Sequence, residues 1–424
     1  MDFPRSRISA TDQIMKIRRI ATALAALFLS VSAAHARTWT SSDGAKTFEG
    51  ELKAYSTETG KVTVTLANGK DLTFPQDKLS ADDIAFLKEK GTIAPPAPAA
   101  ATSSVKAASL PDVLPDPDDK PADMTKPVQV YILLGQSNMV GLGNIPTLKA
   151  ATDAGKFPYM VNDAGEWTVR KDVRNVFIMS LAPQHNDWMS VTNRNKMGPE
   201  FGIGHALGTA IDAPVMILKS CIGNRSLGWD LLPPGSEPYE AGGKTIPGYR
   251  GTPNNPKGNG EKVTGEWYAG KQYDDDVEGA KLVLADLDKH YPGAKEYEVA
   301  GFFFWQGEKD GGSAENAARY EFNLVNFIKA LRKDFDAPNA KFVLATLGEA
   351  TKGSGGNGGL ILDAQLAVDG ESGKYPDFKG NVATVYANPL SMGGSGNGHY
   401  GGNGETYMNV GEAMGRTMAE LLAR

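Results

Sequence analysis

The stretch Val128-Gln-Val-Tyr-Ile-Leu-Leu-Gly-Gln-Ser-Asn-Met139 decides the fold. Its apolar, β-branched part, residues 128–134, is typical of a strand buried on both faces of a parallel sheet. Gly135 follows and lets the backbone turn sharply, so that Ser137 can stand at the carboxyl end of the strand. Ligands of open α/β sheets bind at that edge, which makes Ser137 a candidate nucleophile. The alternative is a helix N-cap, because serine and asparagine are favoured there.

Strands and helices are expected to alternate along the domain at residues 127–424. Strand-like apolar runs recur at 213–219, 297–305, 341–347 and 381–387, and helical patterns at 198–208, 273–290, 314–335 and 407–422. Repeated β-helix-β units with apolar strands predict a parallel sheet covered on both faces. The Gly-, Pro- and Asn-rich residues 220–270 form a long insertion beside strand ends, which is typical of a substrate-site wall.

Three segments precede this domain. Residues 1–36 read as a secretion signal, with basic residues, a short apolar run and the small-x-small site Ala34-His35-Ala36, so a secreted or periplasmic location is expected. An uncleaved anchor is the alternative. Residues 37–91 combine four β-rich runs with one helical run, which resembles the small SH3-like domain that precedes many secreted bacterial enzymes. Residues 92–126 are rich in proline and alanine and are expected to be an extended linker.

Composition limits the possible partners. The formal net charge of −6 argues against nucleic acid or an anionic membrane surface, since neither attracts an acidic chain. Cys221 is the only cysteine, so no intramolecular disulfide can form, and a buried thiol is expected there. No aspartate cluster has the spacing of a calcium loop, and no metal or organic cofactor is expected.

Polar, glycine-bearing clusters follow the expected strands. They are residues 135–139, 220–229, 306–310 and 391–400. Because the carboxyl ends of parallel strands face one crevice, these clusters are expected to converge. That convergence favours the nucleophile interpretation of Ser137.

A serine nucleophile needs a base, normally histidine. Of the five histidines, one lies in the signal, His205 lies in an expected helix and His290 at a helix end. His399 lies in a glycine-rich loop between the last strand and the last helix and is the expected base, with His185 as the alternative. The backbone N–H groups of Ser137 and Gly223 and the side-chain amide of Gln306 are suited to an oxyanion hole.

Four blocks of this sequence resemble, in order and spacing, those of the sialate O-acetylesterase-like SGNH hydrolases, which include the family 6 carbohydrate esterases. The blocks are Gly135-Gln-Ser-Asn-Met139, Gly198-Pro-Glu-Phe-Gly202, Lys219-Ser-Cys-Ile-Gly223 and Trp305-Gln-Gly-Glu308. The resemblance covers about residues 126–424. It implies a flavodoxin-like three-layer sandwich and hydrolysis of O-acetyl groups on sugars.

The resemblance also implies residue roles. Ser137 is the nucleophile, His399 the base, and Gly223 and Gln306 complete the oxyanion hole. Glu308 is a further catalytic-site residue. The expected substrate-binding residues are Gln136, Asn138, Glu200 and Arg225.

One position departs from the superfamily pattern. An aspartate is expected three residues before the histidine, and here that position is Gly396. Either His399 works without an orienting acid, as in a Ser–His dyad, or the acid comes from elsewhere, with Glu308 and Asp310 ahead of Glu405 as candidates.

Two functions follow. The first is a secreted serine esterase that hydrolyses O-acetyl esters on carbohydrate, with the identity of the sugar left open. The second is a cell-envelope carbohydrate-binding protein on a degenerate hydrolase fold, which Gly396 favours. In either case Trp229, Trp267 and Tyr268 in the insertion are expected to stack on sugar rings.

Overall fold

A computed structural model of the chain describes residues 37–57, 60–66, 70–90 and 106–424. These residues fall into two compact units, one within residues 1–95 and the other within residues 96–424. The expected signal sequence and the part of the expected linker at 92–105 lie outside the described residues.

The first unit contains a four-stranded antiparallel sheet in chain order. Its elements are β1 (Arg37–Thr40), β2 (Thr47–Tyr55), β3 (Lys61–Leu66), β4 (Asp71–Pro75), the 3₁₀ turn η1 (Gln76–Lys78) and α2 (Ala81–Lys90). Trp39, Val62, Val64 and Leu87 form its buried core. The expected strands and helix are confirmed, while the likeness to an SH3 domain stays a prediction.

The second unit is built around a seven-stranded sheet in the order β15-β14-β13-β5-β10-β7-β8. The bounds of its strands are β5 (Val128–Gly135), β7 (Arg170–Met179), β8 (Ala182–Met189), β10 (Val215–Ser220), β13 (Tyr297–Trp305), β14 (Lys341–Ala345) and β15 (Val382–Val385). Every neighbouring pair is parallel except β7 and β8, which form an antiparallel edge hairpin.

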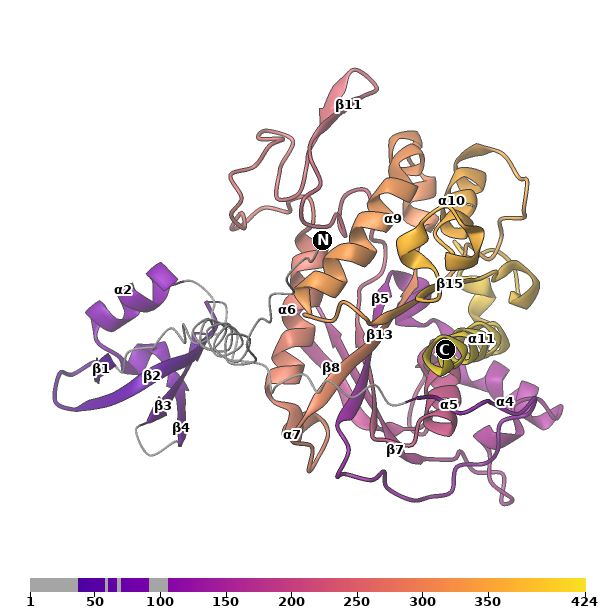
Figure 1. The fold of residues 1–424 in the computed structure, drawn as a ribbon, viewed down its shortest axis with the longest axis horizontal. Coiled ribbons are helices and arrows are strands. Elements are labelled where there is room, and N and C mark those ends of the chain that lie inside the picture. The colour runs from indigo at the N-terminus through magenta and orange to yellow at the C-terminus, as the bar shows by residue number, and fades with distance from the viewer. Residues whose placement is uncertain (1–36, 58–59, 67–69, 91–105) are drawn as a thin grey trace, which may run out of the picture. The chain divides into compact units, whose positions relative to one another are not determined.

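Helices cover both faces of this sheet (Figure 1). They are α3 (Ser137–Val140), α4 (Ile145–Asp153), α5 (Glu200–Ala210), α6 (Lys271–Ala285), α7 (Leu287–His290), α8 (Glu308–Gly311), α9 (Ala314–Asp334), α10 (Gly356–Ala367) and α11 (Gly404–Ala423). The remaining elements are the short strands β6 (Gly143–Asn144), β9 (Lys196–Met197), β11 (Tyr239–Ala241) and β12 (Lys244–Ile246), and the 3₁₀ turns η2 (Pro158–Met160), η3 (Gly370–Ser372), η4 (Pro376–Phe378), η5 (Asn388–Leu390) and η6 (His399–Gly402).

The alternation of side chains along β5 explains the three layers. Val130 and Ile132 belong to the core under α6, α9 and α10, whereas Tyr131 and Leu133 belong to the core under α5 and α11. Successive side chains of a strand point to opposite faces, so an uninterrupted apolar run serves two cores at once. The expected α/β three-layer fold is confirmed.

The chain crosses over at β5. From β5 it runs first to β7 and β10 on one side of the sheet and then to β13, β14 and β15 on the other. The neighbours of β5 are therefore β10 and β13. Ligands of doubly wound folds bind at such a switch point, beyond the carboxyl ends of the strands.

Some elements differ from the sequence expectations. The expected helix 273–290 is interrupted at Asp286, which separates α6 from α7. The hairpin of β7 and β8, and helices α4 and α10, were not expected. Within the described part of the chain, no helix has the length and apolar character needed to cross a membrane.

Candidate active site

The turn after β5 delivers Ser137. Gly135 has φ +150°, and a Cβ on it would lie 2.3 Å from the carbonyl oxygen of Trp305 on β13. Glycine is therefore required both for the conformation and for the close approach of the two strands. α3 begins at Ser137, and its N-cap is Gln136, which makes no side-chain cap. The alternative interpretation of Ser137, as a helix N-cap, is thus wrong.

The Ser137 hydroxyl contacts His399. The Nε2 atom of His399 lies 3.0 Å from Ser137 Oγ, across a sequence separation of 262 residues. His399 itself has φ +54°, in the left-handed region, and its neighbour Tyr400 has φ +53°. The backbone of this loop is strained at two consecutive non-glycine residues, a condition that the surrounding structure has to maintain.

The three other described histidines lie elsewhere. His205 is buried on α5 against the ring of Tyr159. His185 packs edge-on against Phe177 on the hairpin, and burial, with nearby cations, lowers its pKa to about 3. His290 ends α7. The geometry thus brings His399, and not the alternative His185, to Ser137.

Gly223 lies beside the serine. A Cβ on Gly223 would be 3.5 Å from the Cβ of Ser137, an ordinary van der Waals distance. Ser137 is the first residue of α3, so its own N–H has no acceptor within that helix. The backbone N–H groups of these two residues are therefore candidate donors for an oxyanion.

Gln306 does not offer a free donor. Its Nε2 donates to the carbonyl of Arg225 at 2.9 Å and to Asp310 Oδ2 at 2.5 Å, and its Oε1 accepts from Tyr320. An amide NH₂ group has two hydrogens, so both are used. The expectation that Gln306 serves as an oxyanion donor is corrected in this structure: the side chain braces the turn after β13.

Asp310 holds the loop that follows Gly223. Its carboxylate accepts the backbone N–H groups of Leu227 and Gly228, each at 2.8 Å, as well as the amide of Gln306. Burial raises the pKa of Asp310 to about 6, against the lowering effect of these hydrogen bonds. Its oxygens are committed to this loop, so it is no longer a candidate to orient His399.

Glu308 joins both neighbours of the serine. Gln136 Nε2 donates to its Oε2, and Asn138 Nδ2 donates to its Oε1 at 2.6 Å. Burial raises the pKa of Glu308 to about 7, with a further contribution from the charge of Glu349. The carboxyl group therefore changes charge near neutral pH, which is characteristic of functional sites.

Asn138 connects three segments of the site. Besides Glu308, its Nδ2 donates to the carbonyl of Gly396 at 3.1 Å, and its Oδ1 accepts from Tyr407 on α11. Gln136 is 2% exposed and Asn138 is 0% exposed. These two residues, expected to bind substrate, instead position the serine turn relative to the His399 loop.

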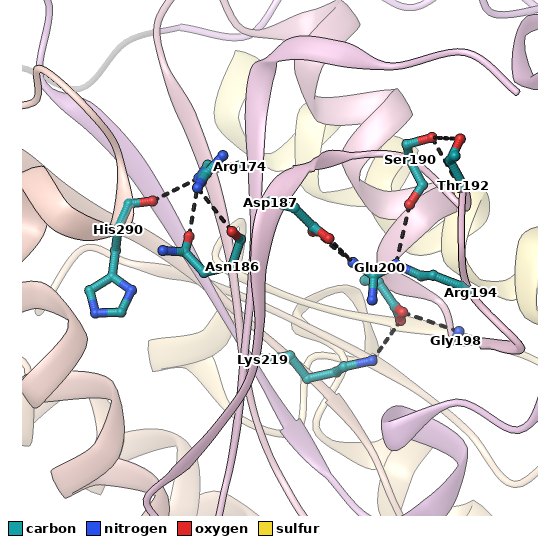
Figure 2. Close-up of polar contacts among 10 residues, drawn as sticks. All are labelled: Arg174, Asn186, Asp187, Ser190, Thr192, Arg194, Gly198, Glu200, Lys219 and His290. Atoms are coloured by element: carbon teal, nitrogen blue, oxygen red, sulfur yellow. Dashed lines mark hydrogen bonds and ion pairs between the residues drawn. The ribbon is translucent and has the colours of Figure 1, made fainter.

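Glu200 is buried, and its carboxylate contacts Lys219 and Gly198 (Figure 2). Its Oε2 lies 2.9 Å from Lys219 Nζ, and its Oε1 accepts the N–H of Gly198 at 3.2 Å. Lys219 also donates to the carbonyl of Val140, the last residue of α3, at 2.7 Å. Because Glu200 is buried, it cannot make the expected contact with a substrate. Its ion pair with Lys219 instead supports the end of α3 at Val140.

The aromatic rings of the insertion that were expected to stack on sugar have different surroundings. Tyr268 is buried and donates to Asp274 at 2.8 Å, so the expectation that it stacks on a sugar is wrong. The guanidinium of Arg225 lies 4.4 Å from the ring centroid of Trp267, and the ammonium of Lys271 lies 5.3 Å from it. Trp267 and the expected substrate ligand Arg225 thus contact each other.

Trp229 faces open space. It is partly exposed and lines a cavity of about 590 Å³, together with Asn316 of α9 and residues 244–247 on and after β12. Its neighbour Gly228 lines the same cavity and is the residue whose N–H Asp310 holds. The cavity therefore shares a loop with the serine site.

Sequence reasoning missed Glu349. This residue follows β14, and its Oε2 accepts the N–H of Gly396 at 3.0 Å. Nothing in the local sequence distinguishes it from an ordinary exposed glutamate. Among the described residues, no group of three or more His, Cys, Asp or Glu side chains is placed to hold a metal ion.

A comparison with known families finds a match within the second unit. Residues 257–420 match the model of the family described as carbohydrate esterase, sialic acid-specific acetylesterase. This range includes Gln306, Glu308 and His399, while Ser137 precedes it. No curated protein matches the chain.

Three solved structures are similar to the chain. A protein from Arabidopsis thaliana is 17% identical, with 68% of this chain and 98% of that chain covered and a TM-score of 0.40. A carbohydrate acetylesterase from Xanthomonas citri is 13% identical, with 68% and 55% covered and a TM-score of 0.40. NanS is 14% identical, with 64% and 79% covered and a TM-score of 0.34.

Proposed function

We propose that this protein is a serine esterase that hydrolyses O-acetyl esters on carbohydrate and acts outside the cytoplasm. The observation that carries the proposal is the 3.0 Å contact between His399 Nε2 and Ser137 Oγ. A hydroxyl within hydrogen-bond reach of an imidazole is the arrangement that activates serine as a nucleophile. The match to the acetylesterase family over residues 257–420 supports the choice of ester and of carbohydrate.

The proposed reaction has two halves. Ser137 Oγ attacks the acetyl carbonyl carbon while His399 Nε2 takes the hydroxyl proton, and the N–H groups of Ser137 and Gly223 stabilise the oxyanion. His399 then returns the proton to the departing sugar oxygen, which leaves an acetyl ester on Ser137. In the second half His399 deprotonates a water molecule, which attacks this ester; His399 then returns the proton to Ser137 Oγ as the bond to the acetyl group breaks and acetate departs.

The cavity beside Trp229 offers a place for a sugar ring. An aromatic ring at the border of a partly polar cavity suits the apolar face of a sugar. The cavity also contains the amide-bearing Asn316 and the cation Lys244, which can hydrogen-bond sugar hydroxyls. In this proposal the glycan extends from the serine into the cavity.

The test is acetate release. The purified protein is incubated with acetylated glycans, including O-acetylated sialic acid and acetylated xylan, and with a small aryl acetate. We expect acetate from the aryl ester and from at least one glycan, and none when Ser137 is replaced in Ser137→Ala. Ser372→Ala, which alters an exposed serine outside the site, is the matched control and retains full activity. A protein that releases no acetate from any of these esters is not an esterase of this kind.

A further inference from the structure

The space beside Gly396 is occupied by groups from other segments. A Cβ on Gly396 would lie 2.5 Å from Glu349 Oε2, 2.8 Å from Glu308 Oε1 and 2.9 Å from the Tyr400 hydroxyl. The φ angle of Gly396 is outside the left-handed region, so its backbone accepts any residue. Space, and not backbone conformation, excludes a side chain here.

The distances identify what fills this space. From standard bond lengths, the carboxylate oxygens of an aspartate lie about 2.4 Å from its own Cβ. The oxygens of Glu349 and Glu308 lie at nearly that distance from the Cβ position of residue 396. Carboxylate oxygens from two other strand ends thus lie almost as close to this Cβ position as the oxygens of an aspartate there would lie.

Both glutamates are held in this place. Glu349 Oε2 accepts the N–H of Gly396, and Glu308 is bound by Asn138, which also donates to the carbonyl of Gly396. The N–H of His399 donates to that same carbonyl at 2.9 Å. The backbone that presents His399 is therefore attached to one glutamate directly and to the other through Asn138.

Other acids of the site are committed elsewhere. Asp310 accepts three N–H groups of the loop beside Gly223 and the turn after β13. Glu405 on α11 forms an ion pair with Lys156. Glu308 and Glu349 remain, each linked to Gly396 in the His399 loop, the former through Asn138. A carboxylate near a base histidine can hold its ring and stabilise its cation.

We propose that Glu349 is a positioning residue for His399 and that, together with Glu308, it supplies the carboxylate that residue 396 lacks. This inference rests on the proposed serine esterase function. The acid of the site then comes from the strands β13 and β14, through the residues that follow them, instead of from the histidine loop. Glu349 acts through His399 and does not touch the ester.

The first experiment replaces Glu349. In Glu349→Gln we expect kcat for an aryl acetate to fall about 10- to 100-fold, with KM unchanged within about twofold, since the residue acts on the base and not on substrate binding. The conservative Glu349→Asp keeps a carboxylate and recovers part of kcat. Glu371→Gln, at another exposed glutamate, is the matched control and retains full activity. Equal thermal unfolding midpoints exclude a general loss of structure.

A second readout is independent of the ester. A fluorophosphonate reacts with a serine only when that serine is activated, so the labelling rate of Ser137 reports on the pair itself. We expect this rate to fall in Glu349→Gln by the same factor as kcat. Unchanged kcat and an unchanged labelling rate in this variant would overturn the inference.

The labelling rate also separates the two proposals. If the unmodified protein is labelled but releases no acetate, the esterase proposal fails, and the effect of Glu349→Gln on labelling still decides the positioning role. If Ser137 is not labelled in the unmodified protein, both proposals fail.

A third experiment exchanges the positions of the acid. Gly396→Asp alone forces a side chain against Glu349 and Glu308, and we expect it to lose activity. Glu349→Ala with Gly396→Asp removes one obstacle and returns a carboxylate to the same volume, so the double variant should be more active than either single variant. A double variant that combines both losses contradicts the inference.

Discussion

At the ends of both β5 and β13 the chain turns through a glycine of similar φ angle, but the two turns have different surroundings. The two strands are parallel neighbours, with Gly135 opposite Trp305. Gly135 at φ +150° and Gly307 at φ +151° then turn each chain into a four-residue helix. After β5 the turn presents Ser137, which is partly exposed beside His399. After β13 the turn presents Glu308, whose carboxylate is bound by the two neighbours of that serine.

The turn after β5 presents a reactive side chain, whereas the turn after β13 presents side chains that hold the site together. The serine is free to react because its backbone neighbours, Gln136 and Asn138, carry the hydrogen bonds that hold the turn. Gln306, at the corresponding place after β13, has its amide donors and its acceptor satisfied within the protein. One strand end carries the reacting group, and its neighbour provides the support.

The largest expected effect comes from breaking the reactive end. Ser137→Ala and His399→Ala are each expected to lower kcat for an aryl acetate by about 10⁴-fold, because nucleophile and base act as a unit. The double variant should be no worse than the worse single variant. Steady-state kinetics of the three variants test this, and independent losses that multiply in the double variant would show that the two side chains do not work together.

The second largest expected effect is on stability and concerns the buried ion pair of Lys219 and Glu200 that contacts α3. Lys219→Met leaves the carboxylate of Glu200 buried without its partner, and the free energy of unfolding should fall by about 3–5 kcal/mol. Urea denaturation measures this loss. Adding Glu200→Gln removes the uncompensated charge, so the double variant should be more stable than Lys219→Met. A double variant less stable than the single one would contradict the role of the buried pair.

The contribution of Glu308, after β13, to the free energy of unfolding should depend on pH. The carboxyl of Glu308 has an ordinary pKa of 4.5 when unfolded and about 7 when folded, so the folded state binds more protons between these values. The free energy of unfolding, relative to Glu308→Gln, should therefore fall as pH rises from 4.5 to 7, by on the order of 2 kcal/mol.

Denaturation of both proteins at pH 4, 5.5, 7 and 8 tests the prediction. The difference between them should be constant below pH 4.5 and nearly constant again above pH 7, where both states have lost the proton. A difference that does not vary across the window would show that Glu308 is not perturbed by its surroundings.

The smallest expected effect concerns the loop that Asp310 attaches to the β13 end. Trp229→Ala removes a ring from the cavity and should raise KM for an acetylated oligosaccharide about 3- to 10-fold, which corresponds to one aromatic contact. The aryl acetate, which has no sugar ring to contact Trp229, serves as the control substrate and should be unaffected. Trp229→Phe should retain most of the affinity. Equal losses for both substrates would place Trp229 at the serine instead.

Elements of this fold are predictable from the sequence when they depend on the residues of a short segment, and less so when they depend on distant contacts. The apolar runs at 128–134 and 297–305 announce β5 and β13 because burial on both faces demands uninterrupted apolar residues. The hairpin of β7 and β8 is less apparent, since an edge strand such as 182–189 carries many polar residues. A helix such as α10, with three glycines and little amphipathic pattern, gives equally little signal.

The candidate site follows the same rule. Ser137 was identified from the turn that follows a buried strand and His399 by elimination among few histidines, and their side chains are in contact in the structure. Gln136, Asn138, Glu200 and Gln306 lie in the right region with different surroundings from those expected. Residue type and motif place a polar side chain near a site, whereas its hydrogen-bond partners come from other segments.

By itself, the sequence determined the buried strands, the turn at Gly135 and the presence of a serine and a histidine able to react. These depend on apolar periodicity and on the conformational freedom of glycine, which are properties of short segments. Only the tertiary structure decided that Gln306 is hydrogen-bonded to Arg225 and Asp310 and that Glu349 accepts the N–H of Gly396. Such contacts depend on which strands are neighbours in the sheet, and strand order arises from the packing of the whole domain.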